Sequence, residues 1–288
     1  MTKAEFRYHA PTTLAEVLRL LSSSADLQPL AGGYVLVPQV SRAGSASAGV
    51  VDLRNVPNLD QIATQQDGHL RVGGMVTLER IASDISIRSN WSALSDAASL
   101  VGDDQTRAHA TLGGAVAIRA DRGAASASGP NDMHAALLAL DARIEVASVD
   151  GVSEVLIADI LQNALPKGSL IVAVLIPEVG VGQASSYVKM RNPASLYPIC
   201  GVASVVGLGK SQQIKSLSLA VTGATDGTQR MAELESALVG GAMPQTMPVQ
   251  GVNLEHCASD SFASADYRQQ MTGVLAQDAI KSAIVRIK

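Results

Sequence analysis

Two glycine pairs, far apart in the chain, are the segments best suited to chemistry. The first lies in the run from Leu30 to Pro38, and the second lies in the run from Ala110 to Ala115. Adjacent residues without Cβ allow backbone N–H groups to approach a bulky anion closely. Because two such segments that meet in space can hold a pyrophosphate between them, the pattern indicates a nucleotide site. Neither segment fits the Rossmann or P-loop pattern, so a nucleotide would bind by another route.

Taken singly, each glycine pair is more typical of a tight turn, and further pairs occur at Gly73-Gly74 and Gly240-Gly241. The run from Gly207 to Ser211 ends like a P-loop, but position 204 is Ser where that motif needs Gly. We interpret it as a hairpin turn between two strands. The function therefore depends on what flanks the glycine pairs at 32–33 and 113–114.

Composition limits the class of protein. The chain has 288 residues, of which 47% are hydrophobic and 17% charged, and this is typical of a folded protein with two or three domains. The net charge of −4 gives no reason to expect nucleic acid as a partner. The two cysteines, Cys200 and Cys257, have no CxxC partner, so any metal redox centre must lie on another polypeptide. Without an apolar run of signal-peptide or membrane-span length, we expect a cytoplasmic protein.

Hydrophobic periodicity and capping signals predict an α+β chain. The first sixty residues or so read as a small βαβ-type unit whose helix is capped by Thr13. Asp132 is expected to cap a helix running through Leu140. A glycine-rich segment, 179–182, reads as a linker between domains. Before the linker, Asp67-Gly68 is expected to turn a hairpin and 170–176 to form a strand. The segments expected after the linker are strands 186–189, 201–206 and 214–221 and helices 229–238 and 266–287, with Ser264 as the cap of the last helix.

Seven motifs occur in order along the chain and include both glycine pairs. They are Phe6-x-Tyr8-x-x-Pro11, Ala31-Gly32-Gly33 with Leu36 and Pro38, Val51-Asp52-Leu53, Gln105-x-Arg107 leading to Thr111-Leu112-Gly113-Gly114, Asn131-Asp132 before 137–142, Lys189 with Tyr197 and 201–203, and Tyr267-Arg268-x-x-Met271. In their order and spacing, these motifs resemble the FAD-binding medium subunit of the molybdenum hydroxylases, the family of xanthine dehydrogenase, aerobic carbon monoxide dehydrogenase and quinoline 2-oxidoreductase.

The resemblance implies an α+β fold in which a two-part FAD-binding domain, of the PCMH or vanillyl-alcohol-oxidase type, precedes a smaller α+β C-terminal domain. The FAD-binding domain would cover residues 1–178, with subdomains at about 1–58 and 59–178. The C-terminal flavoprotein domain would cover residues 183–288.

The resemblance also implies the residues that bind FAD. Backbone amides of 31–35 and 111–115 would cradle its pyrophosphate. Asp132 would accept hydrogen bonds from the adenosine ribose or hold the loop, Lys189 would lie near the polar edge of the flavin, and Tyr197 would gate the ring. No catalytic general base and no metal ligand are implied in this chain. The implied cofactor-binding residues are Ala31, Gly32, Gly33, Tyr34, Val35, Leu36, Thr111, Gly113, Gly114, Ala115, Asp132, Ile171, Lys189 and Tyr197.

The sequence departs from the family pattern at two positions. Tyr34 replaces a small polar residue after the first glycine pair, and Ala115 replaces Asn or Ser after the second. Backbone donors survive both changes, so FAD binding is expected to survive as well. Asp121 is an alternative to Asp132 for the aligned acidic position, and we favour Asp132 because the helix after it matches better.

The function that the resemblance implies is electron transfer within a molybdenum hydroxylase complex. A large molybdopterin-binding subunit and a small [2Fe–2S] subunit would be the partners, as a dimer of heterotrimers. The leading substrate is an N-heterocycle such as quinoline. The alternatives are the medium subunit of an aerobic carbon monoxide dehydrogenase, a stand-alone flavoprotein oxidase or reductase, and a scaffold subunit that has lost FAD.

Overall fold

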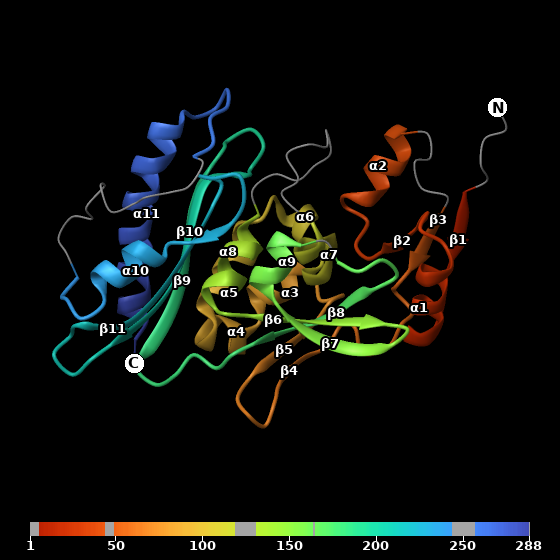
Figure 1. Ribbon diagram of the computed structural model, residues 1–288, viewed down its shortest axis with the longest axis horizontal. Helices are drawn as coiled ribbons and strands as arrows, with labels where there is room; N and C mark the ends of the chain where they lie inside the picture. The colour runs from red at the N-terminus through yellow and green to blue at the C-terminus, as the bar shows by residue number, and fades with distance from the viewer. Residues whose placement is uncertain (1–5, 44–48, 119–130, 164, 244–256, 288) are drawn as a thin grey trace.

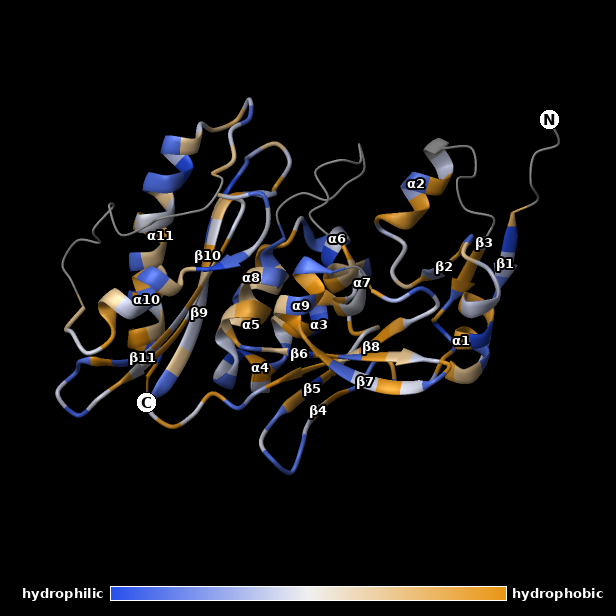
Figure 2. Cartoon of the chain, viewed as in Figure 1, coloured by the Kyte–Doolittle hydropathy of each residue, from blue (hydrophilic) through white to orange (hydrophobic). Residues whose placement is uncertain are grey.

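The computed structural model describes residues 6–43, 49–118, 131–163, 165–243 and 257–287. Three sheets follow one another along the chain, with helices between and upon them (Figure 1). The sheets and helices together form the α+β fold that the sequence predicts. Apolar residues gather on the inner strands and on the helix faces that cover them (Figure 2).

The N-terminal unit is a parallel three-stranded sheet in the order β1-β3-β2. The Thr13 hydroxyl accepts a hydrogen bond from the Glu16 amide at 3.2 Å, which confirms the predicted cap of the first helix. The helix after the first glycine pair, α2, had no clear signal in the sequence. The elements are β1 (Arg7–His9), α1 (Leu14–Ser23), β2 (Leu27–Leu30), α2 (Leu36–Ala43) and β3 (Gly49–Asp52).

The middle unit is a five-stranded antiparallel sheet in the order β4-β5-β8-β6-β7. The predicted Asp67-Gly68 hairpin joins β4 to β5, and Gly68 has the positive φ of 83° that this turn needs. The elements are β4 (Ile62–Thr64), β5 (Leu70–Gly73), α3 (Leu78–Ser83), α4 (Ile85–Asn90), α5 (Ser92–Leu100), α6 (Asp104–His109), α7 (Leu112–Ala117), α8 (Asp132–Ala139), β6 (Arg143–Ser148), β7 (Gly151–Leu156), α9 (Ile157–Gln162) and β8 (Leu170–Ile176).

The C-terminal unit is an antiparallel sheet in the order β12-β11-β10-β9. Helix α11 packs on strands β9 and β10, and helices α5 and α8 of the middle unit pack against the same sheet. The predicted cap of α11 is confirmed, because the Ser264 hydroxyl accepts from the Tyr267 amide at 3.2 Å. The elements are β9 (Gln183–Arg191), β10 (Pro198–Leu208), β11 (Ile214–Thr222), β12 (Gln229–Arg230), α10 (Ala232–Leu238) and α11 (Ala265–Arg286).

Two local predictions were wrong. The segment from Gln229 to Leu238 is not one helix, because Gln229 and Arg230 pair with β11 and the helix begins at Ala232. The cap of α8 is Asn131, whose side-chain oxygen accepts from the Met133 amide at 3.0 Å, and not Asp132. Asp132 is the first residue of that helix, which leaves its carboxylate free to face the next domain.

Helix α8 is buried along its whole length, and it carries a histidine into the core. His134 is 2% exposed, and its Nε2 lies 3.2 Å from the Val116 carbonyl oxygen. Burial lowers the pKa of His134 to about 4 from an ordinary value of 6.5. The folded protein therefore binds a proton less readily than the unfolded chain does.

This histidine predicts a pH dependence of stability. The contribution of neutral His134 is complete above about pH 6.5, is lost as pH falls toward about 4, and amounts to about 3 kcal/mol. The His134→Gln variant should lose stability less steeply than the parent chain over this range. Urea unfolding at a series of pH values measures both slopes, and equal slopes would show that His134 does not titrate as its burial requires.

Candidate functional site

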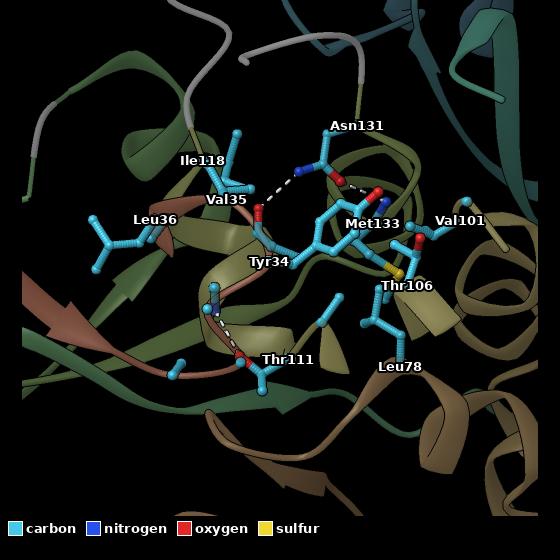
Figure 3. Close-up of a pocket in the computed structure, with 18 of the residues that line it drawn as sticks. Tyr34, Val35, Leu36, Leu78, Val101, Thr106, Thr111, Ile118, Asn131 and Met133 are labelled. Carbon is cyan, nitrogen blue, oxygen red and sulfur yellow. Dashed lines mark hydrogen bonds between the residues drawn. The ribbon is translucent and has the colours of Figure 1, made fainter. Parts of the chain in front are cut away.

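A cleft of about 410 Å³ opens where the first glycine segment faces the middle unit. It collects residues from the β2–α2 connection, from α6, α7 and the start of α8, and from the turn between β9 and β10 (Figure 3). Eleven of the fourteen residues implied by the resemblance line it. They are Ala31, Gly32, Gly33, Tyr34, Val35, Leu36, Thr111, Gly114, Ala115, Asp132 and Tyr197.

The first glycine pair leaves a row of backbone donors at the cleft. Within the part of the chain that the structure describes, the amides of residues 32–35 donate no hydrogen bond. Gly33 has a φ of 74°, which favours glycine, and the segment leads directly into helix α2. Unpaired amides ahead of a helix form a site for an anion, and they need no basic side chain.

The two glycine segments touch one another through Gly32. A Cβ built at this position would overlap the carbonyl oxygen of His109, two residues before Thr111. Only glycine lets the two backbones approach this closely. The sequence prediction that the two segments meet in space is therefore confirmed.

We expected the second glycine pair to lie in a loop of free amides, but it forms the first turn of helix α7. Thr111 caps this helix. The next four amides are all occupied: Leu112 donates to Val76 O at 2.9 Å, Gly113 to Gly74 O at 2.9 Å, Gly114 to Thr111 Oγ1 at 3.3 Å and Ala115 to Thr111 O at 2.9 Å. Of the five amides, only that of Thr111 donates to no described acceptor. The amides without a described acceptor thus lie mainly on the first segment.

Gly113 has a packing role. A Cβ on it would lie 2.9 Å from the carbonyl oxygen of Gly74, so glycine is needed where α7 crosses the turn after β5. Gly113 does not line the cleft. Ile171 does not line it either, because it lies within β8 and is 6% exposed in the core. Its predicted contact with the flavin ring does not follow from this position.

Lys189 also lies away from the cleft surface, although we expected it at the polar edge of a flavin. Its Nζ donates to Asp132 Oδ2 at 3.0 Å and to Leu100 O at 2.7 Å, and its side chain is 1% exposed. The Tyr187 hydroxyl donates to the other carboxylate oxygen of Asp132 at 2.5 Å. The three side chains form one buried cluster behind the cleft.

Burial dominates the electrostatics of this cluster. It raises the pKa of Asp132, and the Lys189 ammonium and the Tyr187 hydroxyl oppose that rise. Burial lowers the pKa of Lys189, against the attraction of Asp132. Because the ion pair has two further hydrogen-bond partners, Leu100 and Tyr187, its charges are compensated within the protein. Asp121, the alternative acidic position, lies outside the described residues.

Two tyrosines are the aromatic residues among those that line the cleft. Tyr34 is 52% exposed and Tyr197 is 44% exposed. Burial raises the pKa of the Tyr197 hydroxyl, and Tyr34 and Asp132 add to that rise. In Figure 3, Tyr34 and Met133 border the same part of the cleft. Flat, apolar surfaces of this kind suit a planar ring.

Sequence reasoning missed two polar residues of the wall. The side-chain nitrogen of Asn131 donates to Ala115 O at 2.7 Å, which ties α7 to α8 across the undescribed segment between them. Thr106 donates from its hydroxyl to Asp103 Oδ1 at 2.6 Å. Both residues lie inside motifs on which the resemblance rests, so the sequence indicated that they lie near the site but did not indicate what they contact.

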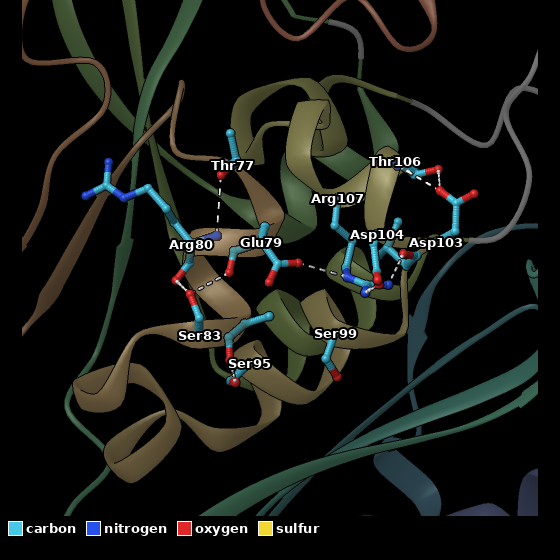
Figure 4. Close-up of polar contacts among 12 residues, drawn as sticks. Thr77, Glu79, Arg80, Ser83, Ser95, Ser99, Asp103, Asp104, Thr106 and Arg107 are labelled. Carbon is cyan, nitrogen blue, oxygen red and sulfur yellow. Dashed lines mark hydrogen bonds and ion pairs between the residues drawn. The ribbon is translucent and has the colours of Figure 1, made fainter.

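Helix α6 is held in place by a polar cluster beside the cleft (Figure 4). Asp103 caps the helix through the Thr106 amide at 2.8 Å. Arg107 pairs with Asp104 and with Glu79 of α3, at 3.3 Å from the latter. The cluster fixes the wall that carries Thr106, and it presents no free charge to the cleft.

No group of histidine, cysteine, aspartate and glutamate side chains suited to a metal ion occurs among the described residues. Across the same residues, no helix is long and apolar enough to span a membrane.

The chain matches two family models that together cover most of its length. The model described as the FAD-binding domain in molybdopterin dehydrogenase matches residues 4–179. The model described as the CO dehydrogenase flavoprotein C-terminal domain matches residues 185–283.

Several known proteins are similar over the whole chain. The carbon monoxide dehydrogenase medium chain of Afipia carboxidovorans is 26% identical to this chain, and the match covers 100% of each protein. The caffeine dehydrogenase subunit beta of Pseudomonas sp. strain CBB1 is 29% identical, over 100% of this chain and 97% of the relative.

Solved structures show the same likeness. The reconstituted CO dehydrogenase from Oligotropha carboxidovorans has a TM-score of 0.88 at 26% identity, over 99% of this chain and 100% of that one. Quinoline 2-oxidoreductase from Pseudomonas putida 86 has a TM-score of 0.85 at 26% identity, over 99% of both chains. The chain therefore belongs to the FAD-binding family of the molybdopterin dehydrogenases, as the medium subunit of a molybdenum hydroxylase.

Proposed function

We propose that the cleft holds the FAD of an electron-transfer subunit, with the pyrophosphate at residues 32–35. The observation that carries this proposal is the row of amides without a described acceptor, at a segment where Gly32 lies against the backbone carbonyl of His109. The described residues of the cleft lining are mostly apolar and include a single carboxylate, Asp132, which suits a ligand with hydroxyl donors at one end and a flat ring at the other.

The chain's own residues bind and orient the dinucleotide. Amides of the first segment donate to the pyrophosphate, and the positive end of α2 adds to their attraction. The Thr111 amide and hydroxyl supply donors from the second segment. Asp132 accepts from the ribose, and Tyr34 and Tyr197 pack against flat rings. When bound, FAD supplies the redox chemistry, taking electrons from partner [2Fe–2S] clusters and giving them to an external acceptor.

The partners in this proposal are a large molybdopterin-binding subunit and a small [2Fe–2S] subunit, arranged as a dimer of heterotrimers in the cytoplasm. The names of the relatives support a multi-subunit complex, since they include medium chains and a 6-hydroxypseudooxynicotine dehydrogenase complex subunit alpha. Within this chain, residues 1–178 would form the FAD-binding domain, and residues 183–288 would form the C-terminal flavoprotein domain.

We place an N-heterocycle first as the substrate of the complex. Relatives named for nicotine, caffeine and nicotinate support this choice, as does the structural likeness to quinoline 2-oxidoreductase. Carbon monoxide is the second candidate, because two medium chains of carbon monoxide dehydrogenases are equally similar over the full length. The large subunit decides between them.

Co-purification of the complex from its native source tests this function. We expect a large and a small partner chain, and we expect the flavin absorption near about 450 nm to bleach anaerobically on addition of an N-heterocycle. Bleaching by carbon monoxide alone would favour the second candidate. Turnover by the isolated chain without partners would contradict the electron-transfer assignment and support a stand-alone flavoprotein.

The unusual Tyr34 predicts a modest effect. The Tyr34→Ser variant should retain FAD, because the amide of residue 34 is kept, and its affinity should change by less than about tenfold. Titration with FAD, followed by flavin fluorescence, measures this change. A loss of binding would mean that the tyrosine ring, and not the backbone, provides the main contact.

A further inference from the structure

The buried cluster behind the cleft crosses from one domain to the other. Asp132 begins helix α8 of the middle unit, whereas Tyr187 and Lys189 lie on strand β9 of the C-terminal sheet. Residues 187 and 189 alternate with Val188 along the strand, so both side chains emerge on the same face of the sheet. That face packs against α5 and α8. Both groups therefore reach the carboxylate from the same side.

Tyr187 has little freedom to move. Its hydroxyl donates to Asp132 Oδ1 at 2.5 Å, and its backbone amide donates to Asp96 Oδ2 at 3.1 Å. Asp96 is itself paired with Arg286 at 2.6 Å. The ring is 3% exposed within the main core. A side chain fixed at both ends can hold the group that it contacts in one orientation.

The carboxylate that Tyr187 holds is still able to bind a ligand. Each oxygen of Asp132 accepts one hydrogen bond from the C-terminal sheet, and each retains a further lone pair. Among the described residues that line the cleft, Asp132 is the only carboxylate, and none is a lysine or an arginine. The nearby Asn131 uses both ends of its amide within the protein. Asp132 is thus the charged acceptor that the described part of the cleft offers to ligand hydroxyls.

We propose that Tyr187 and Lys189 are positioning residues that aim the Asp132 carboxylate at the ribose hydroxyls of the bound dinucleotide. In this way the C-terminal domain sets the geometry of the FAD-binding domain. The inference rests on the function proposed above. It also gives Lys189 a different task from contact with the flavin ring.

The test combines removal of the Tyr187 hydroxyl with removal of the ligand hydroxyls. ADP and 2′,3′-dideoxy-ADP compete with FAD for the FAD-depleted complex, and the ratio of their affinities reports the hydroxyl contact alone. We expect the parent protein to prefer ADP by roughly tenfold or more, as for hydrogen bonds to a charged acceptor. In the Tyr187→Phe variant the preference should fall to about threefold or less, while the affinity for 2′,3′-dideoxy-ADP stays unchanged.

Tyr8→Phe is the matched control. The Tyr8 hydroxyl donates to Asp52 at 2.6 Å, which is the same kind of contact, and neither residue lines the cleft. This variant should keep the full preference for ADP. Unchanged affinity for 2′,3′-dideoxy-ADP shows that the Tyr187→Phe variant is folded.

The results distinguish a failure of the proposed FAD-binding function from a failure of the positioning role. If the parent protein binds no FAD, the proposed function fails. If FAD binds but ADP does not compete, or if Tyr187→Phe keeps the preference of the parent protein, the function stands and the positioning role of Tyr187 is overturned.

Discussion

Gly32→Ala should abolish FAD binding, with a loss of affinity of about 100-fold or more and a loss of stability of roughly 1–3 kcal/mol. The added methyl group would overlap the His109 carbonyl oxygen. This obstacle is backbone, and the next residue is held in place, because the Ala110 amide donates to Thr106 O and the Ala110 carbonyl accepts from the Leu78 amide. The two glycine segments would have to separate, and the row of amides would move with them.

Gly227→Ala is the control for this prediction. No atom lies within 4 Å of a Cβ built on Gly227, and its φ is not positive. Fluorescence titration with FAD and urea unfolding measure both variants. If Gly32→Ala binds FAD as tightly as Gly227→Ala does, the contact between the glycine segments is not what shapes the site.

The second large effect concerns the buried ion pair. Lys189→Met should destabilise the protein by about 3–5 kcal/mol, because it leaves the Asp132 carboxylate buried without its counter-charge. The variant should recover part of this loss as pH falls. Burial already raises the pKa of Asp132, and removal of the ammonium raises it further, so the carboxyl group becomes neutral at a higher pH than in the parent protein.

Two comparisons make this prediction specific. The double variant Asp132→Asn with Lys189→Met should lose less stability than the sum of the single losses, because no charge is stranded. Arg143→Met breaks an ion pair whose side chains are 56% and 48% exposed, and should cost less than about 1 kcal/mol. Urea unfolding at several pH values measures all of these variants. A loss from Lys189→Met as small as that from Arg143→Met would contradict the account of the cluster.

The sequence was sufficient wherever the information is local. Thr13 and Ser264 cap helices because their hydroxyls bond to amides three residues ahead, and Asp67-Gly68 turns a hairpin because glycine permits a positive φ. The strand at 170–176 was predicted from one apolar run, and it lies buried on both faces of the middle sheet. These features depend on neighbours in the sequence.

The site was predictable only in part, because its details depend on residues far apart. Glycine at 113 is compatible both with a free loop and with a helix that crosses another backbone, and the choice depends on Gly74. The sequence shows that Lys189 carries a positive charge, but not that its ammonium group pairs with Asp132, whose Oδ2 lies 3.0 Å from Nζ. Tyr187 gave no signal at all, since its role depends on a carboxylate in the other domain.

The most direct test of the central claim is the FAD content of the purified chain. After reconstitution with FAD and removal of the excess, we predict one FAD for each chain, with absorption near about 450 nm. The same procedure with the Gly32→Ala variant should give a colourless protein. A parent chain that is folded, joined to its partners and free of FAD would contradict the account, and would identify the chain as a scaffold subunit.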